Sequence, residues 1–160
     1  MIVLSTQKVM QLHQFLMQET GGLDGIRDEG LFDSAVQGPF ATFGGQELYP
    51  SIEEKAAKLG VTLTKNHAFL DGNKRIGAYA LLIFLDVNGV AMEYSDADLI
   101  SLGLGMADGT PDYEDVLGWI DRLLSDLIFW AGFTSIRQGS FPSLIQLDIM
   151  HKTKTRNFMF

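Results

Sequence analysis

The chain contains no cysteine and only four prolines among its 160 residues. Without cysteine it can form neither a disulfide framework nor a thiolate metal site, and nothing in it requires an oxidising compartment. Long hydrophobic runs are also missing, because the longest ones, residues 78–85 and 127–133, fall far short of the roughly 20 residues that a membrane span needs. The first residues have neither the basic start nor the apolar stretch of a signal peptide. We therefore expect no membrane association and a cytoplasmic location.

Basic residues are scarce as well. Residues 1–126 hold 8 lysines and arginines against 19 acidic residues, whereas residues 127–160 hold 4 against 1. We expect no direct nucleic-acid binding by so acidic a body. Two of its eight cations, Lys74 and Arg75, are neighbours in the sequence. This placement indicates a local anion site, and a solvated pair at a helix start is the alternative.

Apolar residues make up 46% of the chain, which is long enough to bury a core. Their spacing predicts an all-α bundle. The helix expected from Asn73 to Asn88 is apolar on all sides, which makes it the central element of the bundle. Residues 40–50 contain two adjacent glycines and predict a short loop or hairpin. Other helices are expected from Ser5 or Thr6 to Gly21-Gly22, at residues 29–37, at 51–66 after a capping box, from Ser95-Asp96-Ala97-Asp98, and from Thr110-Pro111.

The domain organisation that we predict is one main domain over residues 1–126 and a C-terminal extension over residues 127–160. The extension is richer in aromatic residues, contains Gly139 and Pro142, and ends in a basic, polar segment. It contains no motif that indicates a role, so its function stays unknown.

The most informative segment is residues 67–75, which read His-Ala-Phe-Leu-Asp-Gly-Asn-Lys-Arg. Histidine has the side-chain pKa closest to neutral pH, so His67 can accept a proton from a hydroxyl. Asp71 can hold Mg²⁺. A lone histidine beside a phenylalanine is usually a packing residue, but a purely structural junction has no need of the five polar or glycine residues that follow. His13, by contrast, is interpreted as a surface or packing histidine, because nothing near it in sequence completes a site.

The second half of the same segment suits a phosphate. Gly72 permits a tight turn that exposes backbone N–H groups, and the helix expected from Asn73 would place a phosphate at its N-terminus. Lys74 adds a point charge and Arg75 a bidentate fork.

The nine residues meet every position of the pattern H-x-F-x-[DE]-[GA]-N-[GK]-R, so the chain resembles the Fic/Doc family. Residues 28–35, 43–50, 54–57 and 84–89 are similar to segments of the death-on-curing (Doc) branch, and the resemblance covers roughly the first 120 residues. It implies a Fic/Doc-like helical bundle.

The resemblance also implies a role for each motif residue, with ATP as substrate and Mg²⁺ as cofactor. His67 corresponds to the general base that activates a hydroxyl of a target protein, and Asp71 to the metal ligand. Phe69 is expected to anchor the loop in the core. The nucleotide phosphates would be held by Gly72, Asn73, Lys74 and Arg75. Lys74 and Arg75 would also be catalytic residues, because they would stabilise the transferred phosphate.

Two positions differ from AMP-transferring members, which usually have glycine in place of Lys74 and arginine in place of Ala78. The Lys74 form resembles the Doc toxins, which are associated with transfer of the γ-phosphate to a threonine of translation elongation factor Tu, blocking translation. Gly72 favours the other chemistry, because Doc has alanine there. A protein kinase is therefore the first interpretation and a protein adenylyltransferase the alternative.

Partners follow from the same resemblance. No inhibitory [ST]-x-x-x-E-[GN] pattern is found, so we expect inhibition by a separate small antitoxin protein, as in Doc systems. The protein substrate, with elongation factor Tu as the candidate, would be recognised through residues 40–50. Two alternatives keep the fold: a catalytically silent module for binding or repression, and a metal-dependent hydrolase that uses the same His67 and Asp71.

Overall fold

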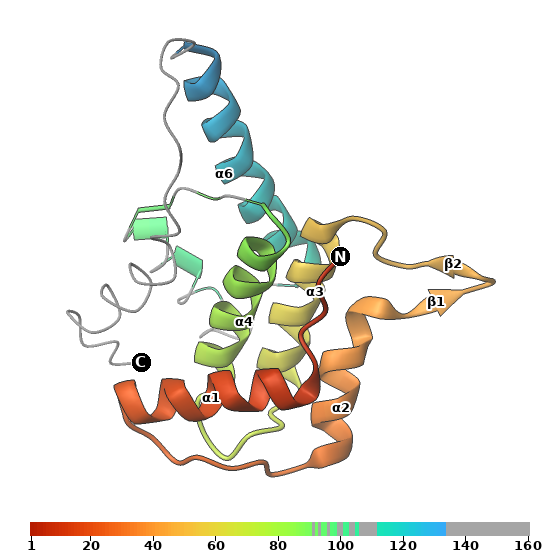
Figure 1. Ribbon diagram of the computed structural model, residues 1–160, viewed down its shortest axis with the longest axis vertical. Helices are drawn as coiled ribbons and strands as arrows, with labels where there is room; N and C mark the ends of the chain where they lie inside the picture. Colours follow the sequence, from red (N-terminus) through yellow and green to blue (C-terminus); the bar gives the residue numbers. More distant parts are fainter. Residues whose placement is uncertain are drawn as a thin grey trace.

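The structure, a computed structural model, describes residues 1–90, 92, 94, 95, 97, 98, 101, 102, 105 and 112–133. It confirms the expected all-α bundle (Figure 1). The elements in chain order are α1 (Thr6–Thr20), α2 (Glu29–Gln37), the 3₁₀ turn η1 (Gly38–Phe40), β1 (Thr42–Phe43), β2 (Gln46–Glu47), α3 (Ile52–Lys65), α4 (Asn73–Val87) and α6 (Tyr113–Phe133).

The starts of the first helices follow from capping side chains. Ser5 caps α1 and Asp28 caps α2, each by accepting a hydrogen bond from a backbone N–H of the first turn. The predicted capping box at the start of α3 is present, with Glu54 N donating to Ser51 Oγ at 3.0 Å and Ser51 N donating to Glu54 Oε2 at 2.7 Å. The expected bounds of these three helices are therefore confirmed to within a residue or two.

The predicted hairpin at residues 40–50 is also present. β1 and β2 pair antiparallel, with Thr42 opposite Glu47 and Phe43 opposite Gln46. In Figure 1 the hairpin projects from the side of the bundle, between α2 and α3 in the sequence. Its base is fixed by the buried Lys55, whose Nζ donates to Glu47 Oε2 at 2.7 Å.

The α4 helix is the central element, as its apolar sequence predicts. Nine of its 15 residues are buried, and it lies beside α3 (Figure 1). Helix α6 packs against α3 and adds four buried residues to the core, Val116, Trp119, Ile120 and Leu123. No helix in the described residues is long and apolar enough to cross a membrane.

Two expected helix starts fall partly outside the described residues. Ser95 and Asp98 exchange hydrogen bonds as a cap would, whereas Asp96 is not described. Thr110 and Pro111 also lie outside, and α6 begins at Tyr113, where Asp112 and Asp115 bond each other reciprocally. Helix α6 continues through residue 126 to Phe133, and residues 134–160 lie outside the described part. The extension at 127–160 therefore stays a prediction.

Two connecting segments meet at one end of the bundle and form the setting of the site. The α1–α2 connection (residues 21–28) runs along the loop between α3 and α4 (residues 66–72, the motif loop), as Figure 1 shows below α1. Leu70 N donates to Gly25 O at 3.0 Å, and Arg27 N donates to Ala68 O at 2.7 Å. These hydrogen bonds join two segments that are more than 40 residues apart in the sequence.

Candidate active site

His67 lies at the start of the motif loop, directly after α3 and its capping residue Asn66. Its φ of 48° is in the left-handed region, which is uncommon for a residue with a Cβ. This turn directs Ala68 and Phe69 into the core, where they are 0% and 1% exposed. The His67 side chain itself is exposed, and within the described residues its ring makes no hydrogen bond. An exposed imidazole is free to approach the hydroxyl of a second protein.

Phe69 and Asn73 close the motif loop. The Phe69 ring is buried edge-on to Phe32 at a centroid distance of 5.0 Å, so it anchors the loop as expected. The Asn73 amide bonds both backbone groups of Phe69: Phe69 N donates to Oδ1 at 2.9 Å, and Nδ2 donates to Phe69 O at 3.0 Å. The side chain of Asn73 therefore fixes the backbone of the motif loop.

Gly72 precedes α4 in the left-handed conformation, with φ 74° and ψ 12°. A Cβ at this position would collide with the end of the Met17 side chain and lie 3.4 Å from His13 Nε2. Glycine therefore suits both the backbone angle and the tight contact with α1. The first backbone N–H groups of α4 have no acceptor within the helix, so this end of α4 favours an anion.

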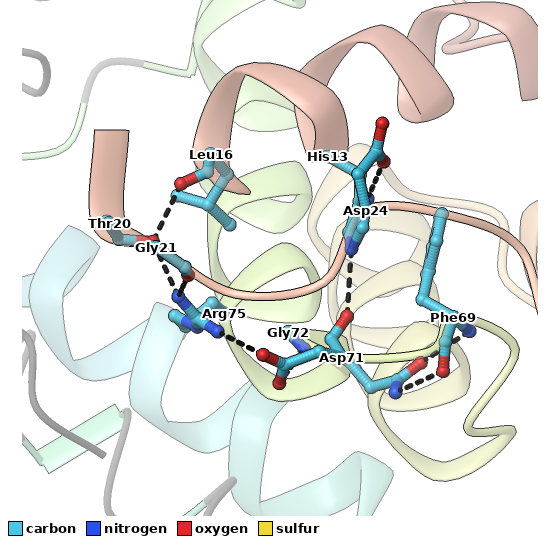
Figure 2. Close-up of polar contacts among 10 residues, drawn as sticks. His13, Leu16, Thr20, Gly21, Asp24, Phe69, Asp71, Gly72 and Arg75 are labelled. Carbon is cyan, nitrogen blue, oxygen red and sulfur yellow. Dashed lines mark hydrogen bonds and ion pairs between the residues drawn. The ribbon is translucent and has the colours of Figure 1, made fainter. Parts of the chain in front are cut away.

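The Asp71 carboxylate is held by donors on two sides and is 44% exposed. Gly72 N donates to its Oδ1 at 2.6 Å, and Arg75 Nη2 lies 3.3 Å from its Oδ2 (Figure 2). Burial by itself would raise the pKa of the Asp71 carboxyl, but the Gly72 N–H, the Arg75 charge and the Leu23 N–H together lower that pKa below its usual value of 3.8. The Asp71 carboxylate is therefore ionised at neutral pH.

The two cations of the motif differ in their surroundings. Lys74 is exposed on the first turn of α4, whereas the Arg75 side chain is only 17% exposed. Arg75 Nη1 donates to Thr20 Oγ1 at 2.5 Å and to Gly21 O at 2.7 Å, which ties the end of α1 to the motif (Figure 2). These bonds and the Asp71 contact use three of the five guanidinium N–H groups, so two remain for a phosphate.

His13 was not expected at this site. Of its two interpretations, a surface histidine is wrong and a packing histidine is confirmed, because the side chain is fully buried and stacks on Phe69. It is 0% exposed, and its Nε2 lies 2.8 Å from the backbone oxygen of Asp71. Its Nδ1 lies 3.2 Å from Asp24 Oδ1 in the α1–α2 connection (Figure 2). A signal was present in the sequence, because Val9, His13 and Leu16 follow helical spacing, and a polar residue on a buried face needs partners.

The residues present fit a magnesium ion that arrives with a nucleotide. Among the described residues no group of three or more histidine, aspartate or glutamate side chains could hold a metal. Mg²⁺ commonly binds one or two carboxylates and completes its shell with substrate phosphates and water. Asp71, partly exposed beside the N-terminus of α4, offers such a carboxylate next to a place suited to phosphate.

Comparison with known proteins identifies the family of the chain. The model of the Fic/DOC family matches residues 3–85, which is more than half of the chain. The chain is 47% identical over 72 residues to "Toxin Doc" of Mycolicibacterium smegmatis, a match that covers 45% of this chain and 55% of the relative, so it spans about half of that protein's length. It is 29% identical over 120 residues to "Protein kinase doc" of Escherichia phage P1, covering 75% of this chain and 94% of the phage protein. The chain belongs to the Fic/DOC family.

Proposed function

We propose that this chain is a Doc-type toxin that transfers the γ-phosphate of ATP, with Mg²⁺, to a hydroxyl group of a protein. The observation that carries the proposal is the motif loop itself. Within the seven residues 67–73 it carries the exposed His67, the ionised Asp71 carboxylate and the N-terminus of α4. Phosphoryl transfer needs little more than positioning and charge stabilisation, and this segment offers both.

Each residue has one task in the reaction. His67 takes the proton from the attacking hydroxyl as the new oxygen–phosphorus bond forms and the bond to the ADP oxygen breaks. Asp71 holds Mg²⁺, which neutralises charge on the phosphates when bound. The first-turn amides of α4, Lys74 and the two remaining Arg75 donors stabilise the negative charge on the moving phosphoryl group.

The preference for phosphate over AMP transfer rests on Lys74 and Ala78. Lys74 is an exposed cation on the first turn of α4, where AMP-transferring members have glycine. Ala78 lies one turn further along α4, and its methyl group cannot clamp a phosphate as arginine would. The name of the phage relative, "Protein kinase doc", supports the same choice.

AMP transfer is the second candidate, and Gly72 is the observation that favours it. Met17 fills the space that a Cβ would take, so the preference rests on residue identity: Doc has alanine at this position and this chain has glycine. With the nucleotide reversed in the site, the α-phosphate instead of the γ-phosphate would face the hydroxyl near His67.

The two chemistries can be distinguished by labelling ATP at either the α- or the γ-phosphate and asking which label reaches the acceptor protein. The purified chain is incubated with Mg²⁺ and ATP labelled either at the α- or the γ-phosphate, first with a bacterial lysate and then with purified elongation factor Tu. Kinase chemistry adds about 80 Da to the acceptor, and AMP transfer adds about 329 Da. Transfer of the γ-label, lost in Lys74→Ala and kept in the matched variant Lys8→Ala on the far end of α1, supports the proposal. Transfer of the α-label contradicts it.

The proposed partners are a small antitoxin protein and the modified protein, with elongation factor Tu as the candidate target in the cytoplasm. The name "Toxin Doc" of the Mycolicibacterium smegmatis relative supports a toxin. The exposed hairpin, with Phe43 81% exposed at its end, is the element that we assign to target contact. Expression of the wild-type chain should arrest growth, and expression of His67→Ala should not.

A further inference from the structure

One buried side chain, His13 of α1, contacts two other segments that meet at the site. Its ring lies parallel to the Phe69 ring, with a centroid distance of 3.9 Å and an interplanar angle of 11°. Its Nδ1 faces Asp24 Oδ1 in the α1–α2 connection, and its Nε2 faces Asp71 O in the motif loop (Figure 2). Arg75 of α4 bonds the same three parts of the chain, through Thr20, Gly21 and Asp71, but at the C-terminal end of α1 and not from within that helix (Figure 2).

The contact with Asp71 fixes more than one atom. A carbonyl oxygen can only accept, so the hydrogen of this bond is on His13 Nε2. The peptide unit between Asp71 and Gly72 is planar and trans, so holding its oxygen also sets the direction of the Gly72 N–H on the opposite side. That N–H donates to Asp71 Oδ1 at 2.6 Å. The orientation of the Asp71 carboxylate is therefore linked to His13 through one rigid peptide unit.

We infer that His13 is a positioning residue: it clamps the motif loop to the α1–α2 connection and holds the Asp71–Gly72 peptide unit in the geometry that the reaction requires. The role goes beyond that of a satisfied core histidine, because neither of its polar partners is in its own helix. Gly72 permits the close approach of this face of α1, since a Cβ there would collide with Met17, one turn after His13. The activity part of this inference rests on the proposed transfer function, whereas the structural part does not.

Two variants separate the hydrogen bond from the packing. His13→Phe keeps a ring that can stack on Phe69 but removes the donor to Asp71 O. His13→Gln gives up the stack but can place its amide donor near the same oxygen. If His13 positions the loop, amide hydrogen exchange at Gly72 and Leu70 should accelerate at least about tenfold in His13→Phe, as expected for the loss of about 1.4 kcal/mol of local protection. His13→Gln should keep exchange at Gly72 within about threefold of wild type.

The activity arm uses the same variants. In His13→Phe, kcat for transfer should fall roughly 10–100-fold while KM for ATP changes less than about threefold, because the Asp71 charge and the phosphate contacts remain and only the alignment of the Asp71 carboxylate is lost. His13→Gln should recover most of kcat. Val9→Ala, which removes packing from the same buried face of α1, is the control: it should lower Tm and leave kcat, measured well below Tm, near wild type.

The outcomes are distinct. Wild-type exchange at Gly72 and wild-type kcat in His13→Phe overturn the inference, and so does a His13→Gln variant that is as defective as His13→Phe in both measurements. If the wild-type chain transfers no phosphate or AMP, the proposed function fails instead. The exchange measurement then still decides whether His13 holds the loop.

Discussion

Gly60 and Gly77 face each other where α3 and α4 pack together. A Cβ added at Gly77 would lie 2.6 Å from Gly60 O and would collide with Thr64 Oγ1. The backbone of α3 cannot give way to a methyl group as a flexible side chain could. These two glycines therefore set the separation of the two helices whose connection is the motif loop.

Replacement of Gly77 by alanine should therefore force the central helices apart. We expect Gly77→Ala to lower the free energy of unfolding by about 2–3 kcal/mol, the upper part of the range for overpacked cores. Gly118→Ala is the matched control, because Gly118 is exposed on α6 and an added Cβ meets nothing within 4 Å. It should stabilise the chain by roughly 0.5–1 kcal/mol through helix propensity. Urea unfolding of both variants tests this, and equal stabilities would show that the helices repack freely.

The Asn73 amide should matter for stability as well as for activity. Asn73→Ala removes the acceptor of Phe69 N and the donor of Phe69 O, and Phe69 is almost fully buried. Leaving two such groups without partners should cost about 1–3 kcal/mol of unfolding free energy. Transfer should fall at the same time, since the loop that carries His67 and Asp71 loses its closure. An unchanged denaturant midpoint would mean that water replaces the amide at no cost.

The sequence predicted the helices well because their signals are local. Capping residues such as Ser51 with Glu54 act within one turn, and the apolar composition of α4 is enough to predict that the helix is buried. The motif residues were also identified from adjacent positions. Their individual roles at the site remain proposals.

The part that could not be predicted depends on contacts across the chain. His13 meets Asp71 over 58 positions, and Arg75 meets Thr20 over 55, so neither pairing leaves a local pattern. The packing interpretation of His13 was right, but its place at the site was missed because its polar partners lie in segments that the fold brings to α1 and not among its neighbours in the sequence. The hydrogen bonds between the Asn73 amide and the Phe69 backbone could not be predicted for a different reason. They depend on the left-handed backbone at His67 and Gly72, which residue types alone do not specify.

The left-handed backbone at His67 allows catalysis and strain to be measured separately. His67→Ala and His67→Gly both remove the base, so transfer should fall roughly 10²–10⁴-fold in each. The stabilities of the two variants should differ. Glycine removes about 1–2 kcal/mol of left-handed strain from the folded state. It also makes the unfolded chain more flexible, which lowers the free energy of unfolding by about 0.5–1 kcal/mol. His67→Gly should therefore be the more stable variant by roughly 0.5–1 kcal/mol. A folded, fully active His67→Ala would disprove the base assignment.

The last prediction concerns the charge of Asp71. Its pKa is lower in the folded chain than its usual value of 3.8, so its ionised form adds stability above that value, and this is lost as the pH falls through the folded pKa. Between about pH 5 and 9 the carboxylate stays ionised, so Asp71 should impose no pH dependence on Mg²⁺ binding there.

Asp71→Asn keeps the shape of the side chain and removes this charge. Mg²⁺-dependent ATP affinity, measured by calorimetry, should then fall at least about tenfold, which corresponds to about 1.4 kcal/mol. Affinity measured without Mg²⁺ should change little or rise, because a negative charge near the phosphates is gone. Asp33→Asn, which removes an exposed carboxylate from α2, is the control for net charge and should leave both affinities unchanged. If wild type and Asp71→Asn bind ATP equally well with and without Mg²⁺, Asp71 is not the metal ligand, and its contacts with Gly72 and Arg75 serve only to hold the loop.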